Sequence, residues 1–204
     1  MILIQSNKES LLNPLQTITG IVERRHTLPI LSNILIEKKN KKILCIATDL
    51  EIQITTTIED NSNIKEQTSS VTVGAKKIQD ILRALPDKTN ITLEYKEDRL
   101  LIKGGKSKFN LQTLPAKDFP KLPADTEILD KVIVQEGELK RLLELVQYAM
   151  AQQDIRYYLN GIFLVKEEGQ LKVVATDGHR LGFALLLLKE KQEKQEIILP
   201  RKTV

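Results

Sequence analysis

The chain has 204 residues with a net charge of +4, and 41% of them are hydrophobic, 28% charged and only 4% aromatic. This is an ordinary globular balance with an aliphatic core, and the mild basic excess is compatible with nucleic acid as a partner without requiring it. Cys45 is the only cysteine, no apolar run approaches the ~20 residues of a membrane span and the N-terminus lacks a signal-peptide pattern, so an internal disulfide and a membrane span are excluded and we predict a cytoplasmic protein.

The first 115 residues alternate between strand-like and helical patterns, beginning with a strand at Met1–Gln5. Apolar residues at spacings of three and four predict a helix over Leu11–Val22, in which Pro14 indicates a kink or a later start. A second helix is predicted at Ala75–Leu85, where Pro86 stops it. Further strands are predicted at Ile30–Glu37, Ile43–Thr48, Glu51–Ile58, Ser70–Val73, Ile91–Tyr95, Leu100–Lys103 and Lys108–Leu114.

A proline cluster separates this region from the rest of the chain. Pro115, Pro120 and Pro123 fall within nine residues and predict an extended linker. After it, the apolar spacing over Leu139–Met150 predicts a third amphipathic helix. Strands are predicted at Val132–Gln135, Leu159–Val165, Leu171–Ala175, Phe183–Leu188 and Glu196–Leu199. We therefore predict an α+β protein with a first domain at residues 1–124 and a second at 125–204.

The two halves carry an internal repeat. Residues 33–36, a charged turn and 43–49 are repeated as residues 160–165, a charged turn and 171–177. Asn33 aligns with Asn160 at an offset of 127, and Asp49 aligns with Asp177 at an offset of 128. The first copy continues with a helix and three strands, whereas the second reaches Val204 where its helix would begin. The repeat therefore predicts that the second domain is incomplete.

Two short motifs suggest chemistry and are better explained as turns. Gly105-Lys106-Ser107 resembles the end of a phosphate-binding loop, but Leu100 stands where that motif needs glycine, and a hairpin turn fits better. Asp177-Gly178-His179-Arg180 could supply a metal ligand and a general acid. No second carboxylate–histidine cluster has metal-ligand spacing, and an Asp-Gly turn explains the pattern. We predict no catalytic residue, no metal site and no cofactor.

Small basic clusters lie on or beside the predicted helices. They are Arg24-Arg25-His26, Lys76-Lys77 with Arg83, Lys140-Arg141 and Arg201-Lys202. On a shared face they would bind phosphates without reading sequence, whereas singly each is more typical of a solvated helix face. Arg156-Tyr157-Tyr158 adds aromatic rings to a basic segment, as in single-strand stacking platforms, although packing of one tyrosine explains it equally well.

Six segments together resemble one family. They are residues 25–33, 47–51, 109–115, 153–161, 175–181 and 200–202. In order and spacing they are similar to the bacterial DNA polymerase III β subunits, the sliding clamps of replication, over the whole chain. The segments Arg156–Gly161 and Thr176–Leu181 are the most specific of the six. Gln152 departs from the pattern, because many relatives carry histidine there.

The resemblance implies a fold and a function. It implies three similar clamp domains per chain, each with two helices packed on antiparallel sheets, of which the third is absent here and the second is truncated. Two full-length chains would close head-to-tail around duplex DNA as a homodimer, which slides without reading sequence. The implied protein partners are the polymerase III catalytic subunit, the clamp loader, and other polymerases and repair proteins. No bond chemistry and no membrane contact are implied.

The resemblance also implies roles for individual residues. The implied DNA-facing residues are Arg25, Lys76, Arg83, Gln153, Tyr157, Tyr158, Arg201 and Lys202. The implied wall of a pocket for partner peptides consists of Leu159, Thr176, Gly178, His179, Arg180 and Leu181. Phe109 and Leu111 are implied in the dimer interface.

Two other functions fit the residues. One is a metal-dependent nuclease or phosphoesterase that uses Asp49, Asp177 and His179. The other is a scaffold built from the same repeat, which would bind linear and circular DNA alike and would ignore polymerase peptides. Nuclease activity lost on Asp177→Ala would favour the first, and equal retention on linear and circular DNA would favour the second.

Overall fold

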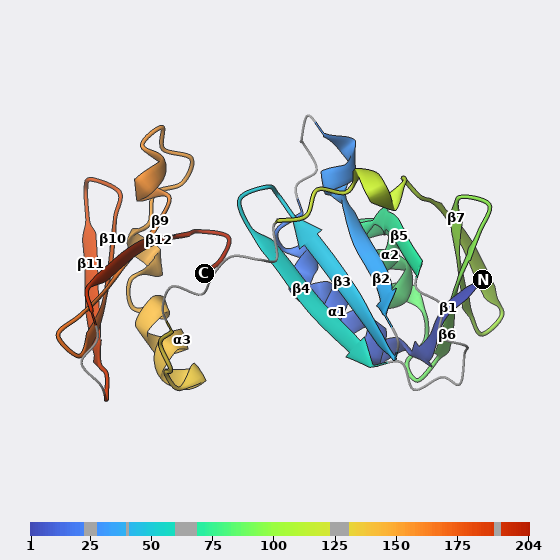
Figure 1. Cartoon of the computed structure of the whole chain (residues 1–204), viewed down its shortest axis with the longest axis horizontal. Helices are drawn as coiled ribbons and strands as arrows, with labels where there is room; N and C mark the ends of the chain where they lie inside the picture. Colours follow the sequence, from blue (N-terminus) through green and yellow to red (C-terminus); the bar gives the residue numbers. More distant parts are fainter. Residues whose placement is uncertain (23–27, 40, 60–68, 123–130, 190–192) are drawn as a thin grey trace. The chain divides into compact units, whose positions relative to one another are not determined.

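The aliphatic runs of the sequence become the strands of three four-stranded antiparallel sheets, and three α-helices accompany them (Figure 1). This computed structural model describes residues 1–22, 28–39, 41–59, 69–122, 131–189 and 193–204. The predicted α+β class is therefore confirmed. The chain divides into unit 1, Met1–Ala124, and unit 2, Asp125–Val204. Among the described helices, none has the length and apolar character needed to cross a membrane.

Unit 1 contains two of the sheets. The first, in spatial order β4-β3-β2-β5, is formed by β2 (Asn33–Lys39), β3 (Lys42–Thr48), β4 (Gln53–Glu59) and β5 (Ser69–Gly74). The second, in spatial order β1-β6-β7-β8, is formed by β1 (Ile2–Asn7), β6 (Asn90–Lys96), β7 (Arg99–Gly104) and β8 (Ser107–Gln112). Because β8 pairs only with β7 among the described strands, it leaves one edge of its sheet open.

Two helices join these sheets into one core. Helix α1 (Lys8–Thr19) begins directly after β1, where the Asn7 side chain accepts a hydrogen bond from the Ser10 amide at 2.8 Å. Helix α2 (Ala75–Ala84) follows β5. Their apolar faces and the inner faces of both sheets form a single aliphatic cluster. Helix α1 runs through Pro14 and begins before Leu11, so the later start is wrong.

The strand prediction at Ile30–Glu37 is partly wrong. Residues Pro29–Ser32 form a 3-10 turn, and the strand begins at Asn33. Proline fixes its own φ near −65°, which suits the first position of such a turn. The Leu31 amide donates to the Leu28 carbonyl at 3.2 Å and closes the turn before β2.

The predicted linker is wrong up to Leu122, because these residues cross the outer face of β4-β3-β2-β5. We call residues 114–122 the strap. Ala116–Asp118 form a 3-10 turn, and Phe119 is only 5% exposed, in a cluster with Leu35 and Ile46. Burial of this aromatic ring fixes the segment against unit 1. Residues 123–130 lie outside the described residues.

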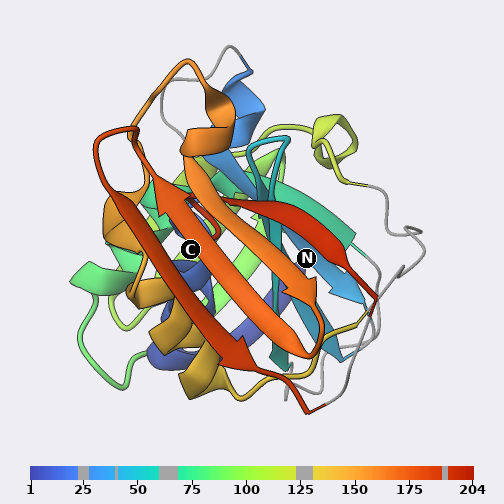
Figure 2. The ribbon, with the colours of Figure 1, turned by 90° about the vertical axis from the view of Figure 1, so that its left-hand side faces the viewer.

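Unit 2 has one sheet in the order β11-β10-β9-β12 (Figure 2). Its strands are β9 (Gly161–Glu167), β10 (Gln170–Thr176), β11 (Leu181–Leu187) and β12 (Gln195–Pro200). Helix α3 (Glu136–Glu144) and two 3-10 turns, Gln147–Ala149 and Tyr157–Leu159, precede the sheet. One face of the sheet packs with α3 and the first turn around Val146, Ile162 and Val173.

Three predictions for unit 2 are corrected. The third helix ends at Glu144, because Val146 lies against Gly182 of β11, where an added Cβ would come within 3.1 Å of the Val146 Cα. The strand predicted from Leu159 begins at Gly161. Val132–Gln135 forms no strand. Its unit 1 counterpart β1 pairs with β6, and the described part of unit 2 has no strand in the place of β6.

The sheet registers also correct the alignment of the repeat. Leu35 of β2 lies opposite Ile46 of β3, and Phe163 of β9 lies opposite Val174 of β10. Equivalent positions on these strands are therefore 128 residues apart throughout. Asn33 corresponds to Gly161, and the offset of 127 at the two asparagines is wrong by one residue.

Candidate nucleic-acid interface and peptide pocket

The loop between the first 3-10 turn of unit 2 and β9 is built around one carboxylate. Asp154 Oδ1 accepts from the Arg156 amide at 2.8 Å and from Arg156 Nε at 3.0 Å, while Oδ2 accepts from Arg156 Nη2 at 2.9 Å. Asn160 fastens the other end, because its Oδ1 accepts from the Asp154 amide at 2.9 Å and its Nδ2 donates to the Asp154 carbonyl at 2.8 Å. These hydrogen bonds hold an exposed loop in one conformation.

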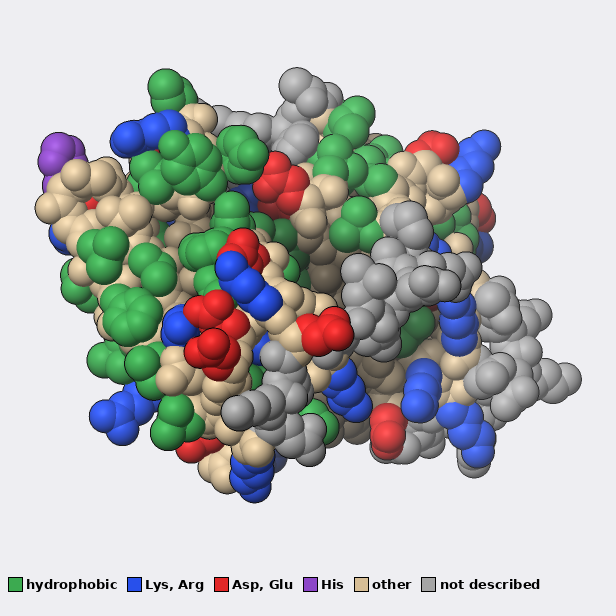
Figure 3. All heavy atoms as spheres, turned by 60° about the vertical axis from the view of Figure 1, so that its left-hand side comes forward, with side chains coloured by type: hydrophobic (Ala, Val, Ile, Leu, Met, Phe, Trp, Pro, Cys, Tyr) green, Lys and Arg blue, Asp and Glu red, His purple; other side chains and the backbone are tan. Residues whose placement is uncertain are grey.

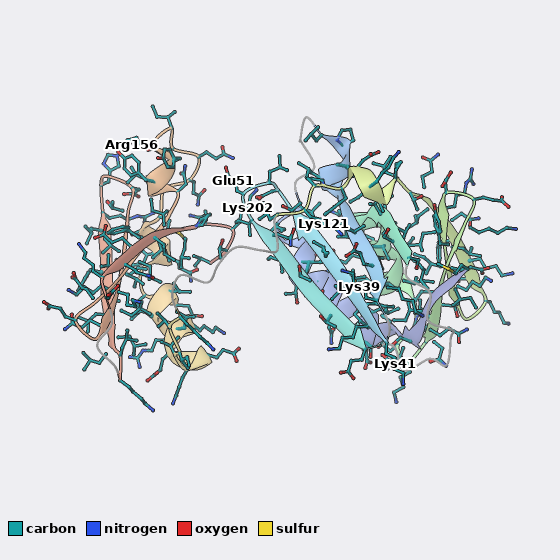
Figure 4. The ribbon with its side chains drawn as sticks, in the orientation of Figure 1. Lys39, Lys41, Glu51, Lys121, Arg156 and Lys202 are labelled. Carbon is teal, nitrogen blue, oxygen red and sulfur yellow. The ribbon has the colours of Figure 1, made fainter. Side chains whose placement is uncertain are left out.

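The same contacts change a pKa. The side-chain and backbone hydrogen bonds from Arg156 lower the pKa of Asp154 from 3.8 to about 2. Asp154 is therefore ionised and paired with Arg156. Because the guanidinium offsets its negative charge, Asp154 repels an approaching phosphate less than an unpaired carboxylate would. Arg156 projects from this loop (Figure 4).

Large side chains project from the loop. Tyr157 is 79% exposed and Tyr158 is half exposed, with ring centroids 5.9 Å apart in an edge arrangement. Gln153 has a φ of +57°, so the backbone turns sharply there. Ile155, which the sequence did not single out, is 98% exposed. A rigid loop that presents rings and an amide can contact a nucleic acid without reading its bases.

Arg201 joins this loop from the other end of unit 2. Its amide donates to the Asn160 carbonyl at 2.9 Å, and its Nη1 lies 3.5 Å from the Met150 carbonyl oxygen. The structure thus places Arg201 beside the loop that carries Gln153, Tyr157 and Tyr158. Lys202 follows on the exposed turn after β12.

Two of the predicted basic residues of unit 1, Lys76 and Arg83, lie on α2. Lys76 and Arg83 are exposed and seven residues apart, which places them on one helix face. Both line a surface hollow of ≈ 770 Å³, and Asp80 between them adds one negative charge. Arg25 lies outside the described residues.

The Asp177 motif is a turn held by its own side chain. Asp177 Oδ1 accepts from the amides of His179 at 2.9 Å and Arg180 at 3.0 Å, and Oδ2 accepts from Arg180 Nε at 2.9 Å. These hydrogen bonds, the two backbone ones first, lower the pKa of Asp177. The Thr176 hydroxyl donates to the Arg180 carbonyl at 2.7 Å, and Gly178 has a φ of +89°.

Unit 1 repeats this turn. Asp49 Oδ1 accepts from the amides of Glu51 at 3.1 Å and Ile52 at 2.9 Å, and the Thr48 hydroxyl donates to the Ile52 carbonyl at 2.8 Å. The shared geometry accounts for both aspartates as turn residues. Within the described ranges, no group of three metal-ligating side chains gathers in one place.

The predicted pocket wall is partly exposed. His179, Arg180 and Leu181 face solvent, whereas Leu159 is 9% exposed and contributes only an edge. Arg180 lies 5.7 Å from the centroid of the Tyr148 ring, a cation–π contact for which the sequence carries no local signal. Tyr148 and Asp177 together fix the guanidinium.

The predicted interface residues lie on the open strand β8. Phe109 and Leu111 are both half-buried and share one face of the strand, where they pack against the unit 1 core. Leu111 also lines the hollow that contains Lys76 and Arg83. An open edge with apolar side chains is suited to pairing with another chain.

Comparison with known proteins decides the family. The family model for the N-terminal domain of the DNA polymerase III beta subunit matches residues 2–123, and the one for its central domain matches residues 133–204. The chain belongs to the DNA polymerase III beta subunit family. The resemblance seen in the sequence is confirmed.

Individual relatives agree with this assignment. The beta sliding clamp of Pseudomonas aeruginosa is 42% identical over 97% of this chain and 53% of its own length. The crystal structure of the Pseudomonas aeruginosa DNA polymerase III subunit beta superposes with a TM-score of 0.89 at 40% identity, covering 99% of this chain and 54% of that one. A second Pseudomonas aeruginosa structure, a sliding clamp bound to griselimycin, has the same TM-score. The chain spans about half the length of these relatives.

Within this member of the family, the structure groups the predicted residues by unit. Gln153, Tyr157 and Tyr158 lie on one loop with Arg201 beside it, and His179, Arg180 and Leu181 follow one another along one turn. Ile155 and Tyr148 are additions from the structure. Their exposure follows from loop geometry, which apolar periodicity does not reveal.

Proposed function

We propose that this chain is the first part of a sliding clamp, which tethers a replicative DNA polymerase to duplex DNA and catalyses no bond chemistry itself. The observation that carries the proposal is the consecutive match of two clamp domains, in the family's order, over residues 2–123 and 133–204. Residues 1–124 would be the first clamp domain and residues 125–204 the first part of the central one. A homodimeric ring is proposed for the complete protein.

The proposed DNA contacts combine rings, amides and positive charge. Tyr157, Tyr158 and Gln153 come from the loop fixed by Asp154, and Arg201 and Lys202 lie on the turn that follows β12. Lys76 and Arg83 would add charge from α2, together with Arg25. Such a surface attracts phosphates without base-specific contacts, so the protein could slide.

The proposed peptide pocket would recruit the partners. Leu181 and the edge of Leu159 offer apolar contact, Thr176 and Gly178 shape the turn, and His179 and Arg180 offer polar groups. Proposed partners are the polymerase III catalytic subunit, the clamp loader, and other polymerases and repair proteins. Tethering raises the effective concentration of a polymerase at the primer end without a new catalytic group.

The proposed subunit contact uses β8. Phe109 and Leu111 would extend the unit 1 core across the open strand edge to a second subunit. The head-to-tail arrangement would then pair this edge with a different surface of the partner chain.

The test of the tethering function uses the complete gene product, loaded by a clamp loader onto nicked circular plasmid. One sample is then cut once by a restriction enzyme, and a matched sample receives enzyme for which the plasmid has no site. Release from the cut plasmid alone is the expected result, because a ring can slide off an end. Equal retention on both would overturn the proposal and would favour ordinary phosphate binding.

Crossed substitutions test the residue assignments in the same complete protein. We expect Tyr157→Ala to weaken duplex binding while a polymerase tail peptide still binds. His179→Ala combined with Arg180→Ala should weaken the peptide while duplex binding remains. If both variants lost both activities, the two surfaces would not be separate.

A further inference from the structure

The loop that carries Tyr157 and Tyr158 is closed by one asparagine. Asn160 Oδ1 accepts from the Asp154 amide at 2.9 Å, and Asn160 Nδ2 donates to the Asp154 carbonyl at 2.8 Å. The Asn160 carbonyl also accepts from the Arg201 amide at 2.9 Å. We call these three contacts the Asn160 lock. The side chain acts as acceptor and donor at once, so a carboxylate, which only accepts, cannot replace it.

The residue after this asparagine is fixed as glycine for a separate reason. Gly161 begins β9 and lies opposite Pro200 of β12. An added Cβ would collide with the Leu199 carbonyl oxygen, so a larger residue would force the two strands apart. The lock and the strand pairing therefore each demand one residue of the dipeptide Asn160-Gly161, which is the only Asn-Gly pair in the sequence.

An Asn-Gly pair is chemically labile because it can deamidate. The glycine nitrogen attacks the side-chain carbonyl carbon of asparagine, the proton of that nitrogen passes to the side-chain NH2 group, and ammonia leaves. The resulting five-membered succinimide is opened by water to aspartate or isoaspartate. One water is consumed and one ammonia released, with no change in oxidation state. Glycine has no side chain to hinder the attacking nitrogen, and its backbone rotates freely.

The folded loop holds this pair in an unreactive geometry. Ring closure needs the Gly161 nitrogen on the same side of the Asn160 Cα–C bond as Cβ, whereas the Asn160 ψ of 31° places it on the opposite side. Rotation about this bond would swing the Asn160 carbonyl away from the Arg201 amide. The side-chain amide is also held at both ends by Asp154. Deamidation therefore requires the loop to open locally.

The product of the reaction cannot rebuild the lock. An oxygen would replace Asn160 Nδ2 and face the Asp154 carbonyl oxygen, so two acceptors would meet without a donor. A negative charge would be added beside the Asp154–Arg156 ion pair. The loop has little other cover, because Tyr157 is 79% exposed, and Figure 3, in which tyrosine is coloured as hydrophobic, shows such side chains at the surface of unit 2. One opening event would thus become permanent.

We propose that Asn160 is a deamidation site that the native loop protects, and that its conversion to aspartate or isoaspartate releases the loop. The asparagine is kept by the lock, and the glycine that makes it labile is kept by the close approach of β12. The proposed protection does not depend on the tethering function, because every contact that it uses lies within unit 2.

The protection is tested by mass spectrometry of the complete gene product after incubation in mildly alkaline buffer. Trypsin cuts after Arg156 and Lys166, and the peptide between them contains Asn160 as its only asparagine. A synthetic peptide of residues 157–166, incubated in parallel, gives the unprotected rate. Asn160 in the protein should deamidate at least about tenfold more slowly than in the peptide. Equal rates would overturn the proposal.

A pair of variants assigns the protection to the loop. Asp154→Ala removes the carboxylate that Arg156 holds and leaves Asn160 and Gly161 unchanged, so it should speed deamidation at least about threefold. The matched control, Lys172→Ala, removes the ion pair with Glu167 at the other end of β9 and should leave the rate unchanged. An unchanged rate in Asp154→Ala, or an equal increase in both variants, would contradict the assignment.

The release is tested by installing the product. In Asn160→Asp, hydrogen exchange of the Leu159 and Arg201 amides, which donate to carbonyls within the loop, should be at least about tenfold faster than in the wild type. The amide of Val173, in the core of the sheet, should keep its rate. Unchanged exchange at Leu159 and Arg201 would overturn the release. An equal rise at Val173 would also overturn it, because the whole unit would then open rather than the loop.

Discussion

In unit 1 the sheet β4-β3-β2-β5 is covered on both faces, by helices on one side and by the strap on the other. In unit 2 the described residues cover the corresponding sheet β11-β10-β9-β12 on one face only. The backbones of the two sheets share strand order and register. The difference therefore lies in the side chains that face outward and in the strap that crosses the sheet of unit 1.

Two sheets with the same strand order and register can thus carry different outer surfaces. In unit 1, Thr72 and Gln53 offer hydrogen-bonding groups at the two ends of the path, and the strap uses both. In unit 2, Ile198 and Leu181 offer only apolar contact. The strap of unit 1 therefore uses polar anchors that the corresponding outward-facing residues of unit 2 do not repeat.

The largest expected effect comes from removing the strap's aromatic anchor. Phe119→Ala should lower the free energy of unfolding by about 3 kcal/mol, because it deletes a buried ring and uncovers Leu35 and Ile46. The matched change Phe183→Ala, at an exposed phenylalanine on the outer face of β11, should cost no more than about 0.5 kcal/mol. Urea unfolding curves of the two variants measure this difference. Equal losses would mean that the two faces are equally covered in solution, and the comparison would fail.

The next effect concerns a lysine that joins the elements of unit 1. Lys8 is almost fully buried, and its Nζ donates to the Leu85 carbonyl at 2.6 Å and to Asp87 Oδ1 at 2.9 Å. Lys8→Met should destabilise unit 1 by about 2 kcal/mol, because a buried carbonyl after α2 loses its donor.

A matched control separates the carbonyl contact from the ion pair. Asp87 is exposed, so its ion pair with Lys8 is screened by solvent, and Asp87→Asn should change the urea midpoint little. A loss from Asp87→Asn as large as that from Lys8→Met would assign the stabilisation to the ion pair. Helix α2 would then not depend on the lysine–carbonyl contact.

A smaller effect tests the turn that both units share. Leu50 has a φ of +80° where unit 2 has Gly178 at +89°. A left-handed conformation costs a leucine about 1–2 kcal/mol, so Leu50→Gly should stabilise unit 1 by up to about 1 kcal/mol after the entropy of glycine is counted. The reverse change, Gly178→Leu, should destabilise unit 2 by about 1–2 kcal/mol. Thermal unfolding of both variants would show opposite shifts, and shifts of the same sign would contradict the shared turn.

The sequence predicted the parts of the fold that depend on apolar periodicity. Short runs rich in aliphatic residues located β3, β5, β7 and β10 within a residue or two, because much of each strand is buried. The helix over Ala75–Leu85 was located for the same reason, with Pro86 as its stop. The repeat was visible because its turns keep the Thr-Asp pair, which forms the same hydrogen bonds in both units.

Tertiary packing decided what the sequence could not. Lys38 and Lys166 are each 2% exposed at equivalent places, although a lysine near a turn predicts solvent exposure. Lys38 Nζ donates to the Leu3 carbonyl at 2.9 Å, a contact between two sheets that no local pattern encodes. Phe119 lies in a proline-rich segment, where composition indicated a linker. The ring of Tyr148 beside Arg180 likewise depends on how separate segments meet.

The smallest expected effect is a pH-dependent loosening of the loop that Asp154 holds. The pKa of Asp154 is lowered from 3.8 to about 2 by hydrogen bonds from Arg156. A lowered carboxyl pKa favours the folded loop while the group is ionised, so this contribution is complete above pH 3.8 and is lost as the pH falls through about 2. Acid should therefore loosen the loop that carries Tyr157 and Tyr158 in this pH window.

NMR titration of the Asp154 and Arg156 amides measures that transition. We expect a midpoint near pH 2, well below the ordinary 3.8. In Asp154→Asn the transition should disappear, because no carboxyl group remains to titrate at this position. A wild-type midpoint near 3.8 would mean that Arg156 does not hold the carboxylate in solution. The loop of unit 2 would then lack the fixed conformation on which its proposed contact with DNA depends, while the turn at Asp49 in unit 1 would be unaffected.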